Sequence, residues 1–447
     1  MVFFDLLPAI DVIAKKLPKQ IGFVAKISSL TDPLLSLYLM SRFLRRDTSL
    51  SRCIPTCKIH ESLTKESPMR TSLMKSLIPS VCLVVGALLF SARAIADDGA
   101  AALGDKQVTI GAVIPLSGSQ AVYGTEASRL FQLLSEGDGY REGGIKFKFI
   151  VEDGKCGVGN APITAAKKLI LLDKAKFLIA GCSGEVLQIA PFTQQQKAIL
   201  FGYISGHRDV KHAGDLVFRS FYDLSSAGSI VGDKLNELGL SKLAVMTEEV
   251  SFTLGIKDVL VDTIGAKIVA KEDYPLDSPD FRGMVARVRQ RKPDSVFINA
   301  AAPHSYIQLY NELRRAGFKG PIFSYYQAGN SEVSSTLGAT QDNVWYISAP
   351  KPNGNSPRFI SLKERYIKRF GADINSEFQF AVVYDALQSI VDAVVAVGDD
   401  PEKVRDYLGS YSAPGATGQI EYDVNGDIKN VKPVLVRVEQ GRAIWPE

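Results

Sequence analysis

The stretch VTIGAVIPLSG, residues 108–118, decides the fold. Residues 108–114 are apolar and rich in β-branched side chains, which predicts a buried strand, and residues 115–118 predict a loop after it. The same pattern of a short apolar strand followed by an amphipathic helix then repeats. We expect helices over 127–137, 161–173 and 186–196, and strands over 146–151, 177–180 and 198–201. Such alternation is typical of a parallel sheet with helices on both faces.

A second series of the same kind begins near Ser225. Strands are expected over 243–246, 266–270, 295–299, 322–323 and 344–347, and helices over 226–238, 254–264, 281–291 and 305–316. A long helix over 375–397 follows, and then two paired strands, 418–422 and 433–438, around a turn at 423–427. The two series together exceed a single comfortable core. The sequence therefore predicts an α/β protein with two lobes that share several chain crossings.

Residues 69–96 have the pattern of a secretory signal peptide. Arg70 and Lys75 form a basic start, residues 77–90 form a short apolar run, and residues 94–96 (AIA) form a small-residue cleavage site. The run is short for a membrane span, although a membrane anchor is the alternative.

A signal peptide belongs at an N-terminus, so we expect Met69 to be the true start. Residues 1–68 are then an unstructured upstream extension, and the mature chain begins near Asp97 and works outside the cytoplasm. The leader, residues 1–96, holds 13 Lys/Arg and 6 Asp/Glu, which leaves 39 basic and 42 acidic residues after it, a formal net charge of −3. The mature chain therefore gives no reason to expect a nucleic-acid partner.

Small hydroxyl residues, glycines and aromatic residues follow three of the predicted strands. Open α/β sheets bind ligands at the carboxyl ends of their strands, and N–H groups at a helix start suit an anion such as a carboxylate. Ser183 and Ser205, each taken singly, are better explained as helix caps than as ligand contacts, but three such loops in one lobe favour a site. The residues concerned are Ser117, Gly118, Ser119 and Tyr123, then Gly181, Cys182, Ser183, Gly184 and Glu185, then Tyr203, Ser205, Gly206 and His207.

The motifs of common enzyme classes are absent from the sequence. There is no G-x-S-x-G elbow, no H-E-x-x-H, and neither of the glycine-rich phosphate loops. We therefore expect no enzyme activity, no cofactor and no metal, with an exported hydrolase built on Ser183 and His207 as the alternative. Cys156 and Cys182 are the two cysteines after residue 96, and in an exported chain they predict one disulfide, two buried free thiols being the alternative.

From Val108 onward the chain resembles the type I periplasmic solute-binding proteins of the leucine/isoleucine/valine-binding family, which serve ABC importers. The resemblance rests on the order and spacing of several stretches. They are IGAVIPLSG (110–118) with Tyr123-Gly124, EDGKC (152–156), GCS (181–183), LRRAG (313–317), YDALQ (384–388) and residues 418–429. The two cysteines fall where the disulfide of this family lies.

The resemblance implies a ligand site between two lobes. Ser183 matches the serine that holds the α-carboxylate of the ligand, and Ser205, Gly206 and His207 match further carboxylate contacts. Tyr123 matches an aromatic wall. Phe252 matches a tyrosine of the opposite lobe, so a hydroxyl is lost there.

The chain departs from the family where the ligand's ammonium group is held. Amino-acid binders of the family place a glutamate after the strand that corresponds to 322–323, whereas this chain has Tyr325, Tyr326 and Gln327. An ammonium buried without a carboxylate is costly. We therefore expect a ligand with a carboxylate or other polar head but no charged amine, such as an aromatic or branched aliphatic acid or an amide. The alternative is that Glu185 or Glu248 reaches the ligand's ammonium group from another direction and replaces the missing glutamate.

The expected mechanism is binding by hinge closure, followed by recognition by a membrane permease. The first lobe is expected over 97–219 and 350–435 and the second over 220–349 and 436–447, with three hinge crossings, and the protein is expected to be a monomer. A ligand-sensing domain that feeds a receptor is the alternative to transport.

Overall fold

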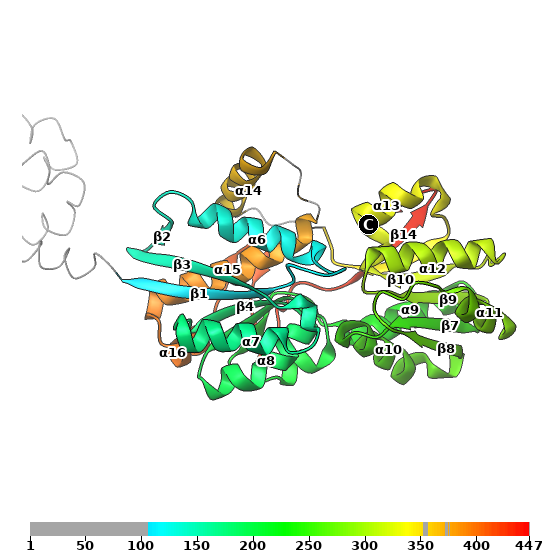
Figure 1. The fold of residues 1–447 in the computed structure, drawn as a ribbon, viewed down its shortest axis with the longest axis horizontal. Coiled ribbons are helices and arrows are strands. Elements are labelled where there is room, and N and C mark those ends of the chain that lie inside the picture. Colours follow the sequence, from blue (N-terminus) through cyan, green and yellow to red (C-terminus); the bar gives the residue numbers. More distant parts are fainter. Residues whose placement is uncertain (1–105, 352–355, 372–373, 375, 447) are drawn as a thin grey trace, which may run out of the picture. The chain divides into compact units, whose positions relative to one another are not determined.

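A computed structural model describes residues 106–351, 356–371, 374 and 376–446, and contains two large sheets flanked by helices (Figure 1). The predicted extension (1–68) and signal peptide (69–96) lie outside the described residues. We call the six-stranded sheet and its helices the first lobe, and the seven-stranded sheet and its helices the second lobe. The predicted two-lobed α/β architecture is confirmed.

The first lobe has the strand order β2-β3-β1-β4-β5-β6, in which only the β2–β3 pair is antiparallel. Three helices from later in the chain, α14, α15 and α16, complete it (Figure 1). The strands are β1 (Gln107–Ile114), β2 (Tyr140–Glu142), β3 (Ile145–Asp153), β4 (Phe177–Cys182), β5 (Ile199–Ile204) and β6 (Val217–Arg219). The helices are α6 (Val122–Ser135), α7 (Ala161–Lys167), α8 (Ser183–Gln195), α14 (Pro357–Phe370), α15 (Glu377–Val397) and α16 (Pro401–Leu408).

Alternation along the central strands explains the layers of the first lobe. Ile110 and Ala112 pack in one apolar cluster with residues of α6 and α15, whereas Val113 packs in another with residues of α7 and α8. Successive strand residues point to opposite faces, so a strand that is apolar on both faces must be covered twice. Gly124 allows α6 to lie directly on the loop after β1, since a Cβ there would come within 1.8 Å of the Pro115 carbonyl oxygen.

The second lobe has the strand order β15-β14-β11-β10-β9-β7-β8, with the β11–β14 and β14–β15 pairs antiparallel. Its strands are β7 (Leu243–Glu248), β8 (Ile268–Tyr274), β9 (Ser295–Asn299), β10 (Ile322–Tyr325), β11 (Val344–Ser348), β14 (Val434–Glu439) and β15 (Arg442–Ile444). Its helices are α9 (Ala227–Glu237), α10 (Ser251–Ile264), α11 (Arg282–Gln290), α12 (Pro303–Arg315) and α13 (Ser331–Leu337).

The chain passes between the lobes three times, as predicted: between β6 and α9, between β11 and α14, and before β14 (Figure 1). The expected pairing of 418–422 with 433–438 is wrong. β13 (Gln419–Ile420) pairs with β12 (Ala413–Pro414), whereas β14 pairs with β11 of the second lobe. There β14 buries Val436 and Val438 at a sheet edge that is otherwise open. The residue boundaries of the lobes stay a prediction. The predicted boundary between residues 435 and 436 falls within β14.

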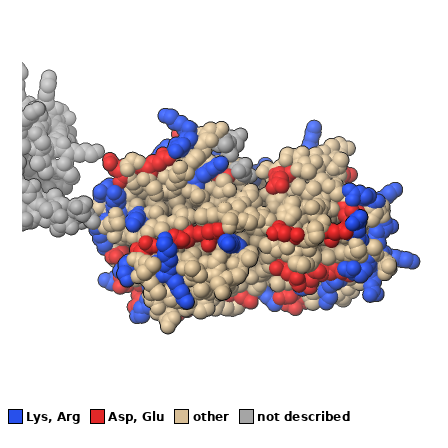
Figure 2. Space-filling view, viewed as in Figure 1, with Lys and Arg blue, Asp and Glu red and all other residues tan. Residues whose placement is uncertain are grey.

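The long helix α15 is apolar enough to cross a membrane by length and composition, but 78% of its most apolar window is buried within the fold. It packs against β4, β5 and α6. This burial identifies it as the core helix of the first lobe. The face shown in Figure 2 carries basic and acidic side chains close to one another.

Candidate ligand-binding site

A cavity lies where the carboxyl ends of strands from both sheets meet. The centre of a water molecule can reach a volume of about 60 Å³ within it, which is room for roughly four to six waters. Seven of its sixteen lining residues are aromatic, and the rest are small, apolar or neutral polar residues. The lining comprises Gln120, Tyr123, Cys156, Cys182, Ser183, Ile204, Phe221, Tyr222, Phe252, Ala301, Tyr325, Tyr326, Gln327, Ala349, Phe378 and Gln379.

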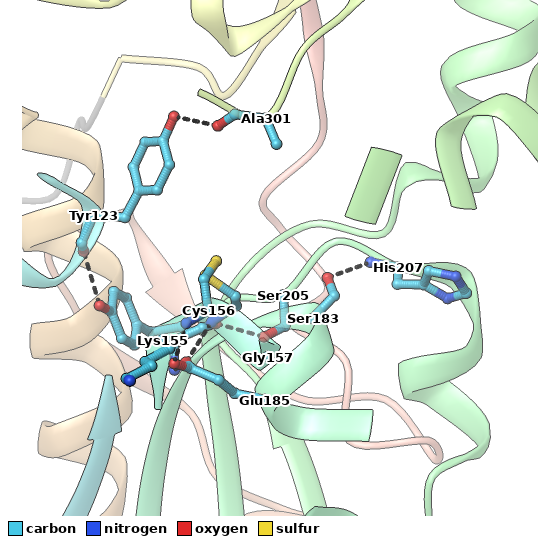
Figure 3. Close-up of a disulfide and its surroundings, with 12 residues drawn as sticks. Tyr123, Lys155, Cys156, Gly157, Ser183, Glu185, Ser205, His207 and Ala301 are labelled. Atoms are coloured by element: carbon cyan, nitrogen blue, oxygen red, sulfur yellow. Dashed lines mark hydrogen bonds between the residues drawn. A yellow bond between two sulfur atoms is a disulfide. The ribbon is translucent and has the colours of Figure 1, made fainter. Parts of the chain in front are cut away.

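Ser183 is the first residue of α8 and lies on the first-lobe side of the cavity (Figure 3). Its hydroxyl oxygen accepts a hydrogen bond of 3.2 Å from the backbone N–H of His207, so its own proton is available to an acceptor in the cavity. The first N–H groups of a helix have no acceptor within the helix, and they carry the positive end of its dipole. This corner can therefore hold an anionic or acceptor group without a lysine or arginine.

The predicted disulfide is confirmed. Cys156 and Cys182 are bonded, with their Cα atoms 5.0 Å apart, and both line the cavity (Figure 3). The bond joins the loop after β3 to the end of β4, and Cys156 adopts a positive φ of 53° there. It therefore braces the loop that lies beside the start of α8.

Aromatic side chains from both lobes form the body of the cavity. The ring centroids of Phe252 and Tyr325 are 4.7 Å apart, and those of Phe221 and Tyr222 are 4.3 Å apart and stacked. The hydroxyls of Tyr222 and Tyr325 share a hydrogen bond of 2.8 Å. Burial raises the pKa of both tyrosines well above its ordinary value, so both stay protonated at neutral pH. A flat or branched apolar group can pack against such rings.

Tyr123 connects the two lobes across the cavity. Its hydroxyl donates to the Ala301 carbonyl oxygen at 2.8 Å (Figure 3). The Gln327 side-chain nitrogen donates to the same carbonyl at 2.8 Å and also to the Tyr123 hydroxyl. Burial raises the pKa of Tyr123 far above its usual value, so this bond persists over the physiological pH range.

The two glutamates left open as partners of an ammonium group are both occupied as backbone caps. Glu185 is fully buried and accepts from the N–H groups of Gly181, Cys182 and Cys156 at 2.9–3.0 Å. Burial raises its pKa to about 8 despite these three donors. Neither it nor Glu248 lines the cavity.

Glu248, at the end of β7, caps the start of α12. It is fully buried and accepts from the N–H groups of Ala301 and Ala302 and from the Ser305 hydroxyl, at 2.6–3.0 Å. Among the lining residues, all of which the structure describes, no Asp, Glu, Lys, Arg or His is present.

The structure brings five of the eight predicted ligand contacts together around the cavity, namely Tyr123, Ser183, Phe252, Tyr326 and Gln327. The other three, Ser205, Gly206 and His207, lie in the loop beside it. Ser205 is buried and donates to the Gly181 carbonyl at 2.7 Å. A Cβ on Gly206 would lie 2.6 Å from Leu224, which shows how tightly this loop packs against the chain after β6.

His207 contacts the second lobe and Ser183 in different ways. The ring packs closely against α10, since a Cβ added to Gly255 would lie 2.3 Å from the ring Cδ2. The ring Nδ1 accepts a hydrogen bond from the Asp209 N–H. Figure 3 shows the ring pointing away from Ser183, which is reached only by the backbone N–H of His207. Within the described chain this arrangement gives Ser183 no general base, which a serine nucleophile needs.

Contacts between the lobes surround the cavity on more than one side. Besides the bonds of Tyr123, the half-buried Arg208 guanidinium lies 2.6 Å from Asp262 of α10. A Cβ on Gly184 would lie 3.2 Å from the Ser251 hydroxyl at the start of α10. The structure therefore shows the lobes in contact around the site.

Eight lining residues were not predicted. Two of them, Ile204 at the end of β5 and Ala301 shortly after β9, lie near strand ends, and the other six come from places without a local signal. Phe378 and Gln379 lie in the first turn of α15, and Phe221 and Tyr222 lie in the first crossing. Ala349 follows β11 in the second crossing, and Gln120 precedes α6. Only Gln120 stood near a stretch that the sequence had marked, the Ser117–Ser119 loop.

Comparisons with known proteins agree with this geometry. A family model described as "Periplasmic binding protein" matches residues 107–441. The leucine-, isoleucine-, valine-, threonine- and alanine-binding protein of Pseudomonas aeruginosa is 22% identical over 352 residues, covering 76% of this chain and 92% of that protein. This chain therefore belongs to the periplasmic binding protein family, as its sequence predicted, and it is a solute-binding protein.

Two solved structures have the same fold. A leucine-binding protein from Thermotoga maritima matches with a TM-score of 0.67 and 20% identity, over 76% of this chain and 98% of that one. An ABC-transporter solute-binding protein from Rhodopseudomonas palustris, solved with 3,4-dihydroxybenzoic acid, matches with a TM-score of 0.64 and 20% identity, over 75% and 95%. The family implies an extracytoplasmic location.

Proposed function

We propose that this protein is the periplasmic solute-binding component of an ABC importer, and that its ligand is a small carboxylate-bearing solute without a charged amine. The observation that carries the proposal is a cavity lined by seven aromatic side chains and no carboxylate. A buried ammonium group left unpaired costs several kcal/mol, so a cavity of this composition disfavours an amino acid.

The carboxylate of the ligand would lie at the start of α8. There the Ser183 hydroxyl donates to it, and the helix dipole favours its charge. The apolar body would pack against Phe252 and Tyr325 of the second lobe and against Tyr222 of the first crossing. The dihydroxybenzoic acid in the Rhodopseudomonas palustris relative is a ligand of this kind, which supports an aromatic acid.

Ligand capture would be coupled to closure of the lobes. Crossings near 218–221, 348–351 and 435–438 would serve as the hinge, and Tyr123 would bond to Ala301 only in the closed form. A permease that recognises the closed form would then receive the ligand, and its ATPase would supply the energy. Genes for permease and ATPase subunits beside this one would support transport over sensing.

A thermal-shift screen tests the proposal. The panel contains leucine, isoleucine, valine and phenylalanine, their 2-oxo acids, benzoate, cinnamate and small amides. A ligand at about 100 times its dissociation constant stabilises the fold by roughly 2.7 kcal/mol, a shift of a few degrees. We expect the acids to shift the midpoint and the amino acids to leave it unchanged. A shift by leucine or valine alone would overturn the proposal.

Ser183→Ala supplies the matched variant. Loss of a hydrogen bond to a charged group costs about 1.5–3 kcal/mol, a loss of affinity of roughly 10- to 150-fold. Ser229→Ala, which removes an exposed hydroxyl bonded to the Ser226 carbonyl on α9, should leave the affinity unchanged. Equal affinities of the two variants would remove Ser183 from the site.

A further inference from the structure

Two side-chain amide oxygens at the cavity are buried without a hydrogen-bond partner. They are Oε1 of Gln327 and Oε1 of Gln120, and no described residue donates to either. Both residues line the cavity, and they are only 4% and 5% exposed. A buried acceptor without a donor is unfavourable, so such atoms point to a missing partner.

The orientation of the Gln327 amide is fixed by its neighbours. The Ala301 carbonyl is only an acceptor, so the group 2.8 Å from it must be the amide nitrogen. The Tyr123 hydroxyl donates its proton to the same carbonyl, so toward Gln327 its oxygen can only accept. With the nitrogen committed in this way, the Gln327 oxygen faces a different direction and is left to accept.

The hydroxyls on the aromatic wall add a spare donor to the same cavity. Tyr222 and Tyr325 hydrogen-bond to one another, and that bond uses one of their two protons. The other proton has no acceptor among the described residues. The residues that line the cavity therefore carry two unused acceptors and one unused donor besides the Ser183 corner, a combination that suits a hydroxyl group, which both donates and accepts.

We propose that the ligand is a hydroxylated aromatic acid, whose hydroxyl donates to the Gln327 or Gln120 amide oxygen while its carboxylate lies at Ser183. This inference rests on the proposed function and narrows its ligand class. A carboxylate or an ether cannot fill the acceptors because neither has a proton to give. A primary ammonium group has protons, but it would bring a full charge into a lining that has no carboxylate.

The test is calorimetric titration of the protein with benzoate, the three monohydroxybenzoates and the three matching methoxybenzoates. A methoxy group keeps the oxygen and removes the proton. We expect one hydroxybenzoate to bind about tenfold more tightly than benzoate and than its methoxy counterpart. Binding of all seven acids within twofold of one another would overturn this inference and leave the proposed function standing.

Variants locate the effect. Gln327→Met and Gln120→Met each keep the side-chain length and remove the amide, and at least one of them should reduce the preference for the hydroxyl to within twofold. Gln290→Met is the matched control, because Gln290 is exposed at the end of α11 and does not line the cavity, and it should keep the preference.

Two results would overturn the assignment. A preference retained in both Gln327→Met and Gln120→Met would remove these amides from the site. Binding of leucine or phenylalanine with no binding of any acid would overturn the proposed function and this inference together.

Discussion

Gly255 gives the sharpest prediction about closure, because replacing it by alanine has opposite effects on folding and on binding. It lies inside α10 of the second lobe, facing His207 of the first. A Cβ at this position would lie 2.3 Å from the ring Cδ2 and 2.6 Å from Nε2, whereas ordinary contacts begin near 3.4 Å. The ring or the helix must therefore move by about 1 Å when the lobes close.

The expected magnitudes follow from that distance. Overpacking of this kind costs about 1–3 kcal/mol, which would weaken ligand binding by roughly 5- to 150-fold. In the open form the same alanine stabilises the helix by about 1 kcal/mol relative to glycine. Gly255→Ala should thus raise the unfolding midpoint of the ligand-free protein by a degree or two while lowering the affinity.

Thermal unfolding without ligand and calorimetric titration with the best acid measure the two effects. Gly283→Ala in α11 is the control, because its Cβ would meet no atom nearer than 3.7 Å. It should leave the affinity unchanged. An affinity of Gly255→Ala within twofold of the parent protein would refute the claim that binding requires this approach of the lobes.

Three further predictions concern stability. Burial raises the pKa of Glu185 to about 8, so the folded protein binds a proton that the unfolded chain releases above its ordinary pKa, about 4.3. Stability should therefore fall between about pH 4.3 and 8 and level off above, and Glu185→Gln should flatten this profile in urea unfolding; an unchanged profile would contradict it. Removing the disulfide with Cys156→Ala and Cys182→Ala, a separation of 26 residues, should cost about 3 kcal/mol, measured by denaturant unfolding against the parent protein with and without reductant. A cost below about 1 kcal/mol would show that packing alone holds the loop. Arg219 is fully buried and pairs with Asp427 while donating to two backbone carbonyls of the 205–207 loop, so Arg219→Met should cost about 3–5 kcal/mol; recovery of most of it by adding Asp427→Asn would identify the unpaired carboxylate as the cause.

The architecture was readable from the sequence because its signals are local. Apolar runs such as 108–114 and 177–180 are too short for helices and are followed by amphipathic segments, and these patterns do not depend on distant residues. The predicted C-terminal hairpin is wrong because strand pairing depends on distant residues. Residues 433–438 have the pattern of a strand, but β14 pairs with β11, where Val436 and Val438 are buried, and this partner lies far away in the sequence.

The candidate site was readable only in part. Residues that follow strands, such as Tyr123 and Ser183, could be placed because the carboxyl ends of the strands meet at one edge of a sheet. Phe378 could not, since α15 reaches the cavity only through the tertiary fold. Glu185 and Glu248 stayed open in the sequence because a carboxylate that caps a helix and one that binds a ligand have the same local pattern.

The most direct test of the central claim compares ligands that differ only in the ammonium group. Calorimetric titration of the protein with 3-phenylpropanoate against phenylalanine, and with 4-methylpentanoate against leucine, isolates that group. The structure predicts that in at least one pair the deaminated acid binds 100-fold or more tightly than the amino acid, since an unpaired buried charge costs about 3–5 kcal/mol. Tighter binding of the amino acid in both pairs would show that an anion reaches the ligand's amine, and would contradict the account of a cavity without a carboxylate.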